Sequence, residues 1–299
     1  MSGCERTDGR RAPRRRPRPG QALRPFARAA VAALACVTAA LALHPRPAFA
    51  ADDARDLIEQ ARRLNDGARA WKDRQQTLAL EIFDGRGGTR RRELVMKTLR
   101  GHGGEDKTIT VFREPSEVRG TSFLQFAHKD RDAEQWLYLP ELKRVRQITS
   151  RAKDQSFMGT DFSYRDLELL TDVLEWTADE ARATSKGNDT IDGDEAALIE
   201  LVPLKKDVGY SRIVIALSRR DLVIRRMEFY RDADAPKKVL RLDRIEPAGV
   251  VPTARRLEMV QPDAGTRTVV DVSDVRYDQG LAEDLFTQRA LERAGEDAG

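Results

Sequence analysis

Histidines and clusters of acidic residues are the side chains in this sequence that could bind a metal ion or take part in catalysis. His102 lies in GHGG and His128 in HKDRD, and both segments are typical of polar turns. A zinc site needs several Cys, His or carboxylate ligands at close spacing, and neither histidine has them. The acidic runs at 192–195 and 232–236 fall at predicted turns and lack the full set of oxygen ligands that Ca²⁺ requires. The sequence therefore predicts no metal site and no cofactor.

Two aspartates, Asp161 and Asp166, flank an apolar segment and could in principle do acid–base chemistry. Aspartate and serine more often cap a helix or organise a turn, and either Asp161 or Ser163 could cap a helix predicted to start near Tyr164. The sequence also contains no G-x-S-x-G elbow, no phosphate-binding loop and no dinucleotide fingerprint. We therefore predict that the protein is not an enzyme.

The segment SFMGTDFSY, residues 156–164, contains unusually large apolar side chains for a predicted loop. Loops usually lie in water and are polar, and burying one such side chain is worth roughly 1.5–3 kcal/mol. Four of these side chains lie within nine residues: Phe157, Met158, Phe162 and Tyr164. They are either ordinary core residues or the lining of a cavity that a ligand can enter.

A basic run precedes that loop. Residues 136–153 pass from Trp136 and Tyr138 through a turn at Pro140 into a series of cations: Lys143, Arg144, Arg146, Arg151 and Lys153. Such side chains can pair with phosphate groups. The run is either the solvated face of a hairpin, a rim for an anionic lipid head group, or a docking site for a membrane-protein partner. A shift of one residue in strand register would exchange the faces of Trp136 and Tyr138 with those of Leu137 and Leu139.

In most of the rest of the chain, apolar and polar residues alternate as they do in β-strands, and these strands must position the residues named above. Residues 52–68 have the 3–4 spacing of a helix, whereas Leu78, Leu80 and Ile82 alternate with smaller or polar residues as in a strand. Strands and turns then follow at short intervals, with a predicted turn at Asp192 and Gly193. Helices are expected after Ser163 and at 282–294. About a dozen antiparallel strands form a sheet that curls, and a loop could cover its concave face.

The first 50 residues have the features of a secretory signal peptide. A basic stretch is followed by an apolar run at 26–43 and by the small-x-small pattern of Ala48 and Ala50. The apolar run is short for a membrane span, which needs roughly 20 residues. We expect cleavage before Ala51, export to a bacterial periplasm, and a single domain at 51–299.

Removal of this leader reverses the sign of the net charge. The whole chain has 53 Lys+Arg and 49 Asp+Glu, of which the leader holds 10 and 2, so the remainder has 43 and 47 and a net charge of −4. Both cysteines also lie in the leader. The remaining chain therefore predicts neither a nucleic-acid partner nor disulfides.

Several long motifs resemble one known family. They occur along almost all of residues 52–293: KTITVFREPSEVRGTSFL, WLYLPELKRVRQI, SFMGTDFSYRDL, VPTARRLEMV and SDVRYDQGLAEDLFTQRALER. Together they resemble the periplasmic outer-membrane lipoprotein-sorting proteins of the LolA/LolB-like superfamily. The resemblance implies an α+β fold, mainly β: an unclosed antiparallel barrel of about eleven strands, with a helical lid over an apolar cavity. It also implies carriage of a lipid or lipidated protein, an RND-type transporter as a possible partner, and no catalysis.

Two functions remain open from the sequence. The first is a carrier or chaperone that holds an acyl chain in the cavity, and the second is a non-catalytic adaptor that docks on an inner-membrane transporter. The candidates for docking or head-group binding are Lys143, Arg144 and Arg146. The candidates for the cavity and its lid are Phe123, Phe126, Trp136, Tyr138, Phe157, Met158, Phe162, Tyr164 and Leu167.

Overall fold

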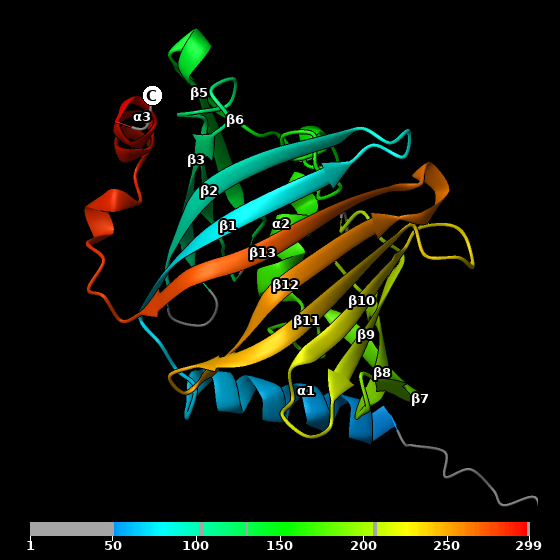
Figure 1. Ribbon diagram of the computed structural model, residues 1–299. Coiled ribbons are helices and arrows are strands. Elements are labelled where there is room, and N and C mark those ends of the chain that lie inside the picture. The colour runs from blue at the N-terminus through cyan, green and yellow to red at the C-terminus, as the bar shows by residue number, and fades with distance from the viewer. Residues whose placement is uncertain (1–50, 102–104, 130, 206–207, 298–299) are drawn as a thin grey trace, which may run out of the picture. The chain divides into compact units, whose positions relative to one another are not determined.

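The computed structural model describes residues 51–101, 105–129, 131–205 and 208–297 (Figure 1). The predicted signal peptide at 1–50 and His102 lie outside the described residues. The described residues belong to one compact unit. None of the helices in this part of the chain is both long and apolar enough to cross a membrane.

One antiparallel sheet of thirteen strands contains two meanders that meet at its centre. Its strand order is β6-β5-β4-β3-β2-β1-β13-β12-β11-β10-β9-β8-β7, so β1 pairs with β13 and the chain leaves and re-enters the sheet at opposite edges. The first meander comprises β1 (Asp73–Phe83), β2 (Thr89–Leu99), β3 (Lys107–Glu114), β4 (Ser122–Phe126), β5 (Glu134–Leu139) and β6 (Arg144–Gln147). The second comprises β7 (Ala181–Ile191), β8 (Asp194–Pro203), β9 (Arg212–Ser218), β10 (Ile224–Tyr230), β11 (Lys238–Ala248), β12 (Val251–Gln261) and β13 (Thr266–Tyr277).

The edge strands β6 and β7 do not pair with each other, so the curved sheet is an unclosed barrel. The predicted fold class is confirmed, with thirteen strands where the resemblance implied about eleven. The predicted turn between β7 and β8 is also confirmed. Asp192 and Gly193 both have positive φ, at 51° and 78°, as a two-residue hairpin turn with the twist of the strands requires.

In the described part of the chain, three α-helices accompany the sheet: α1 (Ala51–Asp66), α2 (Tyr164–Asp172) and α3 (Gln288–Glu296). In Figure 1, α2 lies behind the central strands and α1 runs along the lower rim. Both belong to the segments that cover the inner face, because Ala54, Leu57 and Leu169 share one core cluster with inward residues of the strands. Since β6 and β7 are opposite edges, the connection that carries α2 crosses the whole inner face.

The helix α3 covers the other face, and it starts later than the sequence predicts. Leu291 packs with Ile109 and Leu124 in a second cluster on the outer side of β3 and β4. The predicted helix at 282–294 is interrupted, because a 3₁₀ turn at Glu283–Leu285 ends at Phe286, and the Thr287 hydroxyl then accepts the Ala290 N–H at 3.1 Å as a new N-cap. At Gly295 a Cβ would lie 2.5 Å from a backbone oxygen, so α3 can approach the sheet only with glycine there.

Candidate functional site

A cavity of about 450 Å³ lies on the inner face of the sheet. Strands β1–β4 and β11–β13 supply most of its wall, and residues of and just after α2, among them Leu167, Leu170 and Leu174, cover it. Strand alternation brings every second residue of each strand to this face, which is why one stretch of β1 contributes both Leu78 and Leu80. The volume falls within the range of pockets that bind small ligands.

Polarity changes along the cavity in rows that follow the strand register. The row through Arg74 pairs it with Thr98 of β2 and Tyr277 of β13, and Thr98 pairs with Thr108 of β3. Two rows further along β1, Leu78 pairs with Leu94 and with Val272. The cavity therefore has a polar end at the start of β1 and an apolar end toward the residues 157–162.

Charged groups gather at the polar end, which is also the end nearer to solvent. Arg74, Arg100, Asp106 and Glu175 line it, and all four are half-buried. The two guanidinium groups lie over the ring of Trp71, with their carbon atoms 5.3 and 5.2 Å from its centroid. By contrast, Leu94, Phe123 and Phe157 at the apolar end are buried.

The loop of residues 156–163 closes the apolar end, and backbone contacts fix it there. Arg92 of β2 donates to the carbonyl oxygen of Met158, and Arg90 donates to that of Gly159 at 3.4 Å. Met158 and Gly159 have φ of 51° and 75°, a left-handed conformation that glycine adopts without strain. Within the loop, Phe157 N–H donates to the Phe162 carbonyl at 2.7 Å.

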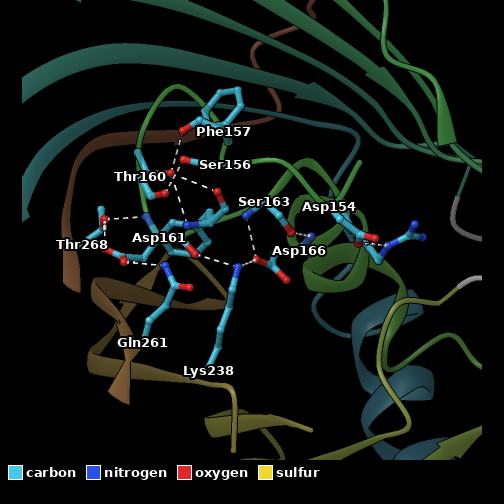
Figure 2. A network of polar contacts seen from close by, with 12 residues as sticks. Asp154, Ser156, Phe157, Thr160, Asp161, Ser163, Asp166, Lys238, Gln261 and Thr268 are labelled. Atoms are coloured by element: carbon cyan, nitrogen blue, oxygen red, sulfur yellow. Dashed lines mark hydrogen bonds and ion pairs between the residues drawn. The ribbon is translucent and has the colours of Figure 1, made fainter. Parts of the chain in front are cut away.

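Asp161 anchors the same loop to the second meander (Figure 2). Its carboxylate accepts hydrogen bonds from three side chains of β12 and β13 at 2.5–2.8 Å: Gln261, Thr266 and Thr268. The Asp161 backbone N–H also donates to the Thr268 hydroxyl at 2.9 Å. Because this aspartate is buried and fully engaged by neutral donors, its position is that of a structural anchor.

Asp166 joins the start of α2 to a buried lysine. Ser163 caps the helix: its hydroxyl accepts the Asp166 N–H at 3.1 Å, and the Asp166 carboxylate accepts the Ser163 N–H at 2.7 Å. The predicted cap is therefore Ser163 rather than Asp161. The same carboxylate receives Lys238 Nζ at 2.6 Å and the Tyr210 hydroxyl at 2.7 Å. Burial, and then the Asp166 charge, raise the pKa of Tyr210 and keep it a donor.

A second buried pair holds the other side of the connection. Lys153 Nζ lies 2.5 Å from the Glu168 carboxylate and donates to the Ala133 carbonyl at 2.8 Å. Gln135 of β5 donates to the Tyr164 carbonyl at 2.9 Å. With the contacts of Asp161 and Asp166, these bonds make the cover over the cavity a rigid part of the structure.

The predicted cavity residues divide between the two faces of the sheet. Phe123, Phe157, Phe162 and Leu167 line the cavity. Met158 and Tyr164 pack in the same core without lining it. Phe126, Trp136 and Tyr138 are not brought to the cavity, because they lie on the outer face in the cluster under α3.

The register of β5 explains this division. Leu137 pairs with the inward residue Phe123, whereas Trp136 pairs with the outward residue Leu124, so the aromatic residues of β5 point away from the cavity. The predicted docking residues Lys143, Arg144 and Arg146 are exposed at the turn before β6 and on this edge strand. They lie apart from the charged polar end of the cavity, none of them among its lining residues.

Sequence reasoning missed the four charged residues of the polar end. One signal could have found Arg74. In the alternating pattern of β1, the inward positions 78, 80 and 82 are apolar, but the preceding inward positions hold Arg74 and Gln76. An inward strand face that begins with polar residues and continues with apolar ones indicates that the enclosed cavity has one polar and one apolar end. Glu175 follows α2 and joins the polar end only through the crossing of the chain, which the sequence pattern does not contain.

Glu175 provides a test of these electrostatics by pH. Burial, and then the negative charge of Asp66, raise the pKa of the Glu175 carboxyl. A raised pKa in the folded state stabilises the fold below the ordinary carboxyl pKa, and this contribution is lost as pH rises through the folded pKa. We therefore expect Glu175→Gln to raise the melting temperature at pH 7.5 and to change it much less at pH 4, measured by thermal unfolding.

For the matched control, Asp189→Asn, we expect a change in melting temperature of the opposite sign. The hydrogen bond from Arg226 lowers the pKa of Asp189, whose carboxylate lies 2.9 Å from that guanidinium. Asp189→Asn should therefore lower the melting temperature at pH 7.5, with the difference shrinking as pH falls through the carboxyl range. Equal effects of Glu175→Gln at both pH values would show that its carboxylate is not desolvated.

Comparisons with known proteins agree with this architecture. A family model described as an uncharacterized protein matches residues 104–293. A domain from Vibrio parahaemolyticus described as outer membrane lipoprotein-sorting is 29% identical, with a TM-score of 0.74 over 81% of this chain and 100% of that one. A DUF1329 family protein from Desulfovibrio piger is also 29% identical, with a TM-score of 0.73 over 81% and 98%.

A more distant structure shows the same fold. A LolA superfamily protein from Nitrosomonas europaea is 17% identical, with a TM-score of 0.60 over 79% of this chain and 98% of that one. The resemblance to the lipoprotein-sorting proteins that the sequence motifs indicate is thus confirmed. No curated protein matches the chain in sequence.

Proposed function

This chain belongs to the family of uncharacterized proteins whose model matches residues 104–293, and on that premise we propose that it is a non-catalytic carrier in the periplasm. It would hold an acyl chain of a lipid or lipidated protein in the cavity between the sheet and α2. The similarity to a domain described as lipoprotein-sorting supports a carrier of this kind.

The observation that carries the proposal is an apolar cavity inside a rigid fold. The space of about 450 Å³ is lined at one end by leucine, valine and phenylalanine side chains, which include Leu78, Leu94 and Val270. Protein interiors are normally packed to the density of organic crystals, so a void of this size forfeits contacts unless a ligand fills it. An acyl chain has the shape and polarity to make those contacts.

The test is the lipid content of the native protein. We would express the chain with its leader, purify it from the periplasm without detergent, extract it with organic solvent and analyse the extract by mass spectrometry. About one bound lipid or acylated peptide per chain is the result expected of a filled single site. A well-folded protein that contains no lipid, and takes up none from vesicles, would contradict the carrier and favour the adaptor.

We also propose that the basic edge of the sheet docks on a membrane surface or on an RND-type transporter. Arg144 and Arg146 are exposed on the edge strand β6, and in the described part of the chain neither has an ion-pair partner. Charged residues also protect edge strands from aggregation, so exposure by itself is not a docking signal.

The double variant Arg144→Glu with Arg146→Glu tests whether these residues dock on a surface or only protect the edge strand from aggregation. We expect it to weaken sedimentation with anionic vesicles by about tenfold or more, since each basic residue near such a surface contributes about 1 kcal/mol. The matched control, Arg182→Glu with Lys186→Glu, makes the same charge change on the opposite edge strand β7. Equal losses in both variants would mean that net charge, and not this edge, determines the binding.

A further inference from the structure

The polar end of the cavity contains a buried guanidinium nitrogen without a hydrogen-bond partner. Arg74 Nε is buried, and no hydrogen-bond acceptor lies within reach of it. Among the described residues, no carboxylate lies within ion-pair distance of Arg74, although its charge acts on the nearby Asp106 carboxyl, and its guanidinium carbon lies 5.3 Å from the centroid of the Trp71 ring. A buried donor without an acceptor costs free energy, so this site is suited to an oxygen supplied by a ligand.

Two carboxylates at the same end make no ion-pair contact among the described residues, although the charges of nearby arginines act on both. Within the described chain, Glu175 has no hydrogen-bond or ion-pair partner, and Asp106 accepts only the Gly101 N–H at 3.1 Å. Burial is the main cause that raises the pKa of both. The remaining cation, Arg100, is already neutralised, since it pairs with Asp66 at 3.0 Å and donates to the Asn65 carbonyl at 3.1 Å.

The rows of the cavity give such a ligand one orientation. Arg74, Thr98 and Thr108 form the polar row at the end nearer to solvent, and the walls become apolar toward Phe157 and Phe162. An amphipathic lipid therefore enters with its chain directed toward the loop of residues 156–163. Its head group stays at the row of Arg74.

We propose that this end binds a zwitterionic phospholipid head group, with the phosphate on Arg74 and the ammonium group facing Glu175 and Asp106. The inference rests on the proposed carrier function and names the class of its cargo. A neutral glyceride would bring no anionic oxygen to the unpaired Nε–H of Arg74. A fatty acid would satisfy Arg74 but would meet two carboxylates with no positive charge to offer them. Only a head group that carries both a negative and a positive charge can pair with Arg74 and also with the carboxylates of Glu175 and Asp106.

The test compares three lipids of the same chain length on delipidated protein by calorimetry: lysophosphatidylethanolamine, the fatty acid and the monoacylglycerol. We expect the zwitterionic lipid to bind at least about tenfold more tightly than the other two. Arg74→Gln should weaken the zwitterionic lipid by about 10- to 100-fold and leave the monoacylglycerol unchanged. Glu175→Gln should weaken the zwitterionic lipid but strengthen the fatty acid.

Arg74→Gln should also weaken binding of the fatty acid, whose carboxylate loses its cation, whereas Glu175→Gln should strengthen it. These opposite responses distinguish head-group recognition from a loss of folding. Arg91→Gln serves as the matched control. Arg91 also lies on β2, in the outward alternation, where it pairs with Glu81 at 2.9 Å, so this change should alter none of the affinities. Equal binding of all three lipids, or an equal loss of all three in Arg74→Gln, would overturn the head-group proposal and leave the carrier intact. Failure of every lipid to bind wild-type protein would overturn both.

Discussion

Replacing Asp166 by alanine is expected to lower the free energy of unfolding by about 3–5 kcal/mol, measured by urea denaturation at pH 7. The side chain of Asp166 is fully buried and meets three groups at once: Lys238 Nζ, the Tyr210 hydroxyl and the Ser163 N–H. Alanine removes the side-chain half of the capping box, since Ser163 N–H loses its acceptor, and it leaves the buried ammonium group of Lys238 with only the Asp161 carbonyl at 2.8 Å.

Two further variants test this explanation. Asp154→Ala breaks ion pairs with Arg165 and Arg231 at a half-exposed site (44% exposed), and it should cost about 1 kcal/mol or less. Combining Asp166→Leu with Lys238→Met should cost clearly less than the sum of the two single changes, because the double variant leaves no unpaired buried charge. Additive losses would mean that Asp166 contributes only through the capping box with Ser163.

The fold could be predicted from the sequence because its signals are local. Alternation in β1 and the turn at Asp192 and Gly193 each specify their own conformation within a few residues. The apolar spacing of Leu57, Ile58, Ala61 and Leu64 likewise predicts α1, and the first three of these are buried while Leu64 is half-buried. The C-terminal helix was misplaced because Thr287 interrupts a segment whose composition is helical throughout.

The candidate site could be predicted only in part, because it depends on how distant segments meet. The apolar loop drew attention to Phe157 and Phe162, which line the cavity, while their part in ligand binding stays a prediction. The face of Trp136 could not be derived, since a shift of one residue exchanges the faces of a strand. Asp166 completes the capping box of Ser163, a local role, but its partner Lys238 lies 72 residues away in the second meander. No local pattern contains such a pairing.

A substitution that fills the cavity should abolish lipid binding without unfolding the protein. Leu242 of β11 and Leu257 of β12 face each other across the strand pair, are only half-buried and line the cavity. Phe162 is a poorer target, because it is buried in the core cluster and its loss would create a defect there. We expect Leu242→Trp with Leu257→Trp to reduce the co-purified lipid at least about tenfold.

The stability of the occluded variant is the decisive comparison. Overpacking a filled core costs about 1–3 kcal/mol, but here the two indoles enter space that is empty, so the free energy of unfolding should change by about 1 kcal/mol or less. The matched control places the same side chains at the neighbouring cross-strand pair, Arg241→Trp with Glu258→Trp, in the outward alternation of the same strands. Because these indoles leave the cavity open, the control should retain its lipid. Full lipid content in the occluded variant would place the lipid elsewhere on the protein, and loss in both variants would implicate the strand pair rather than the space it encloses.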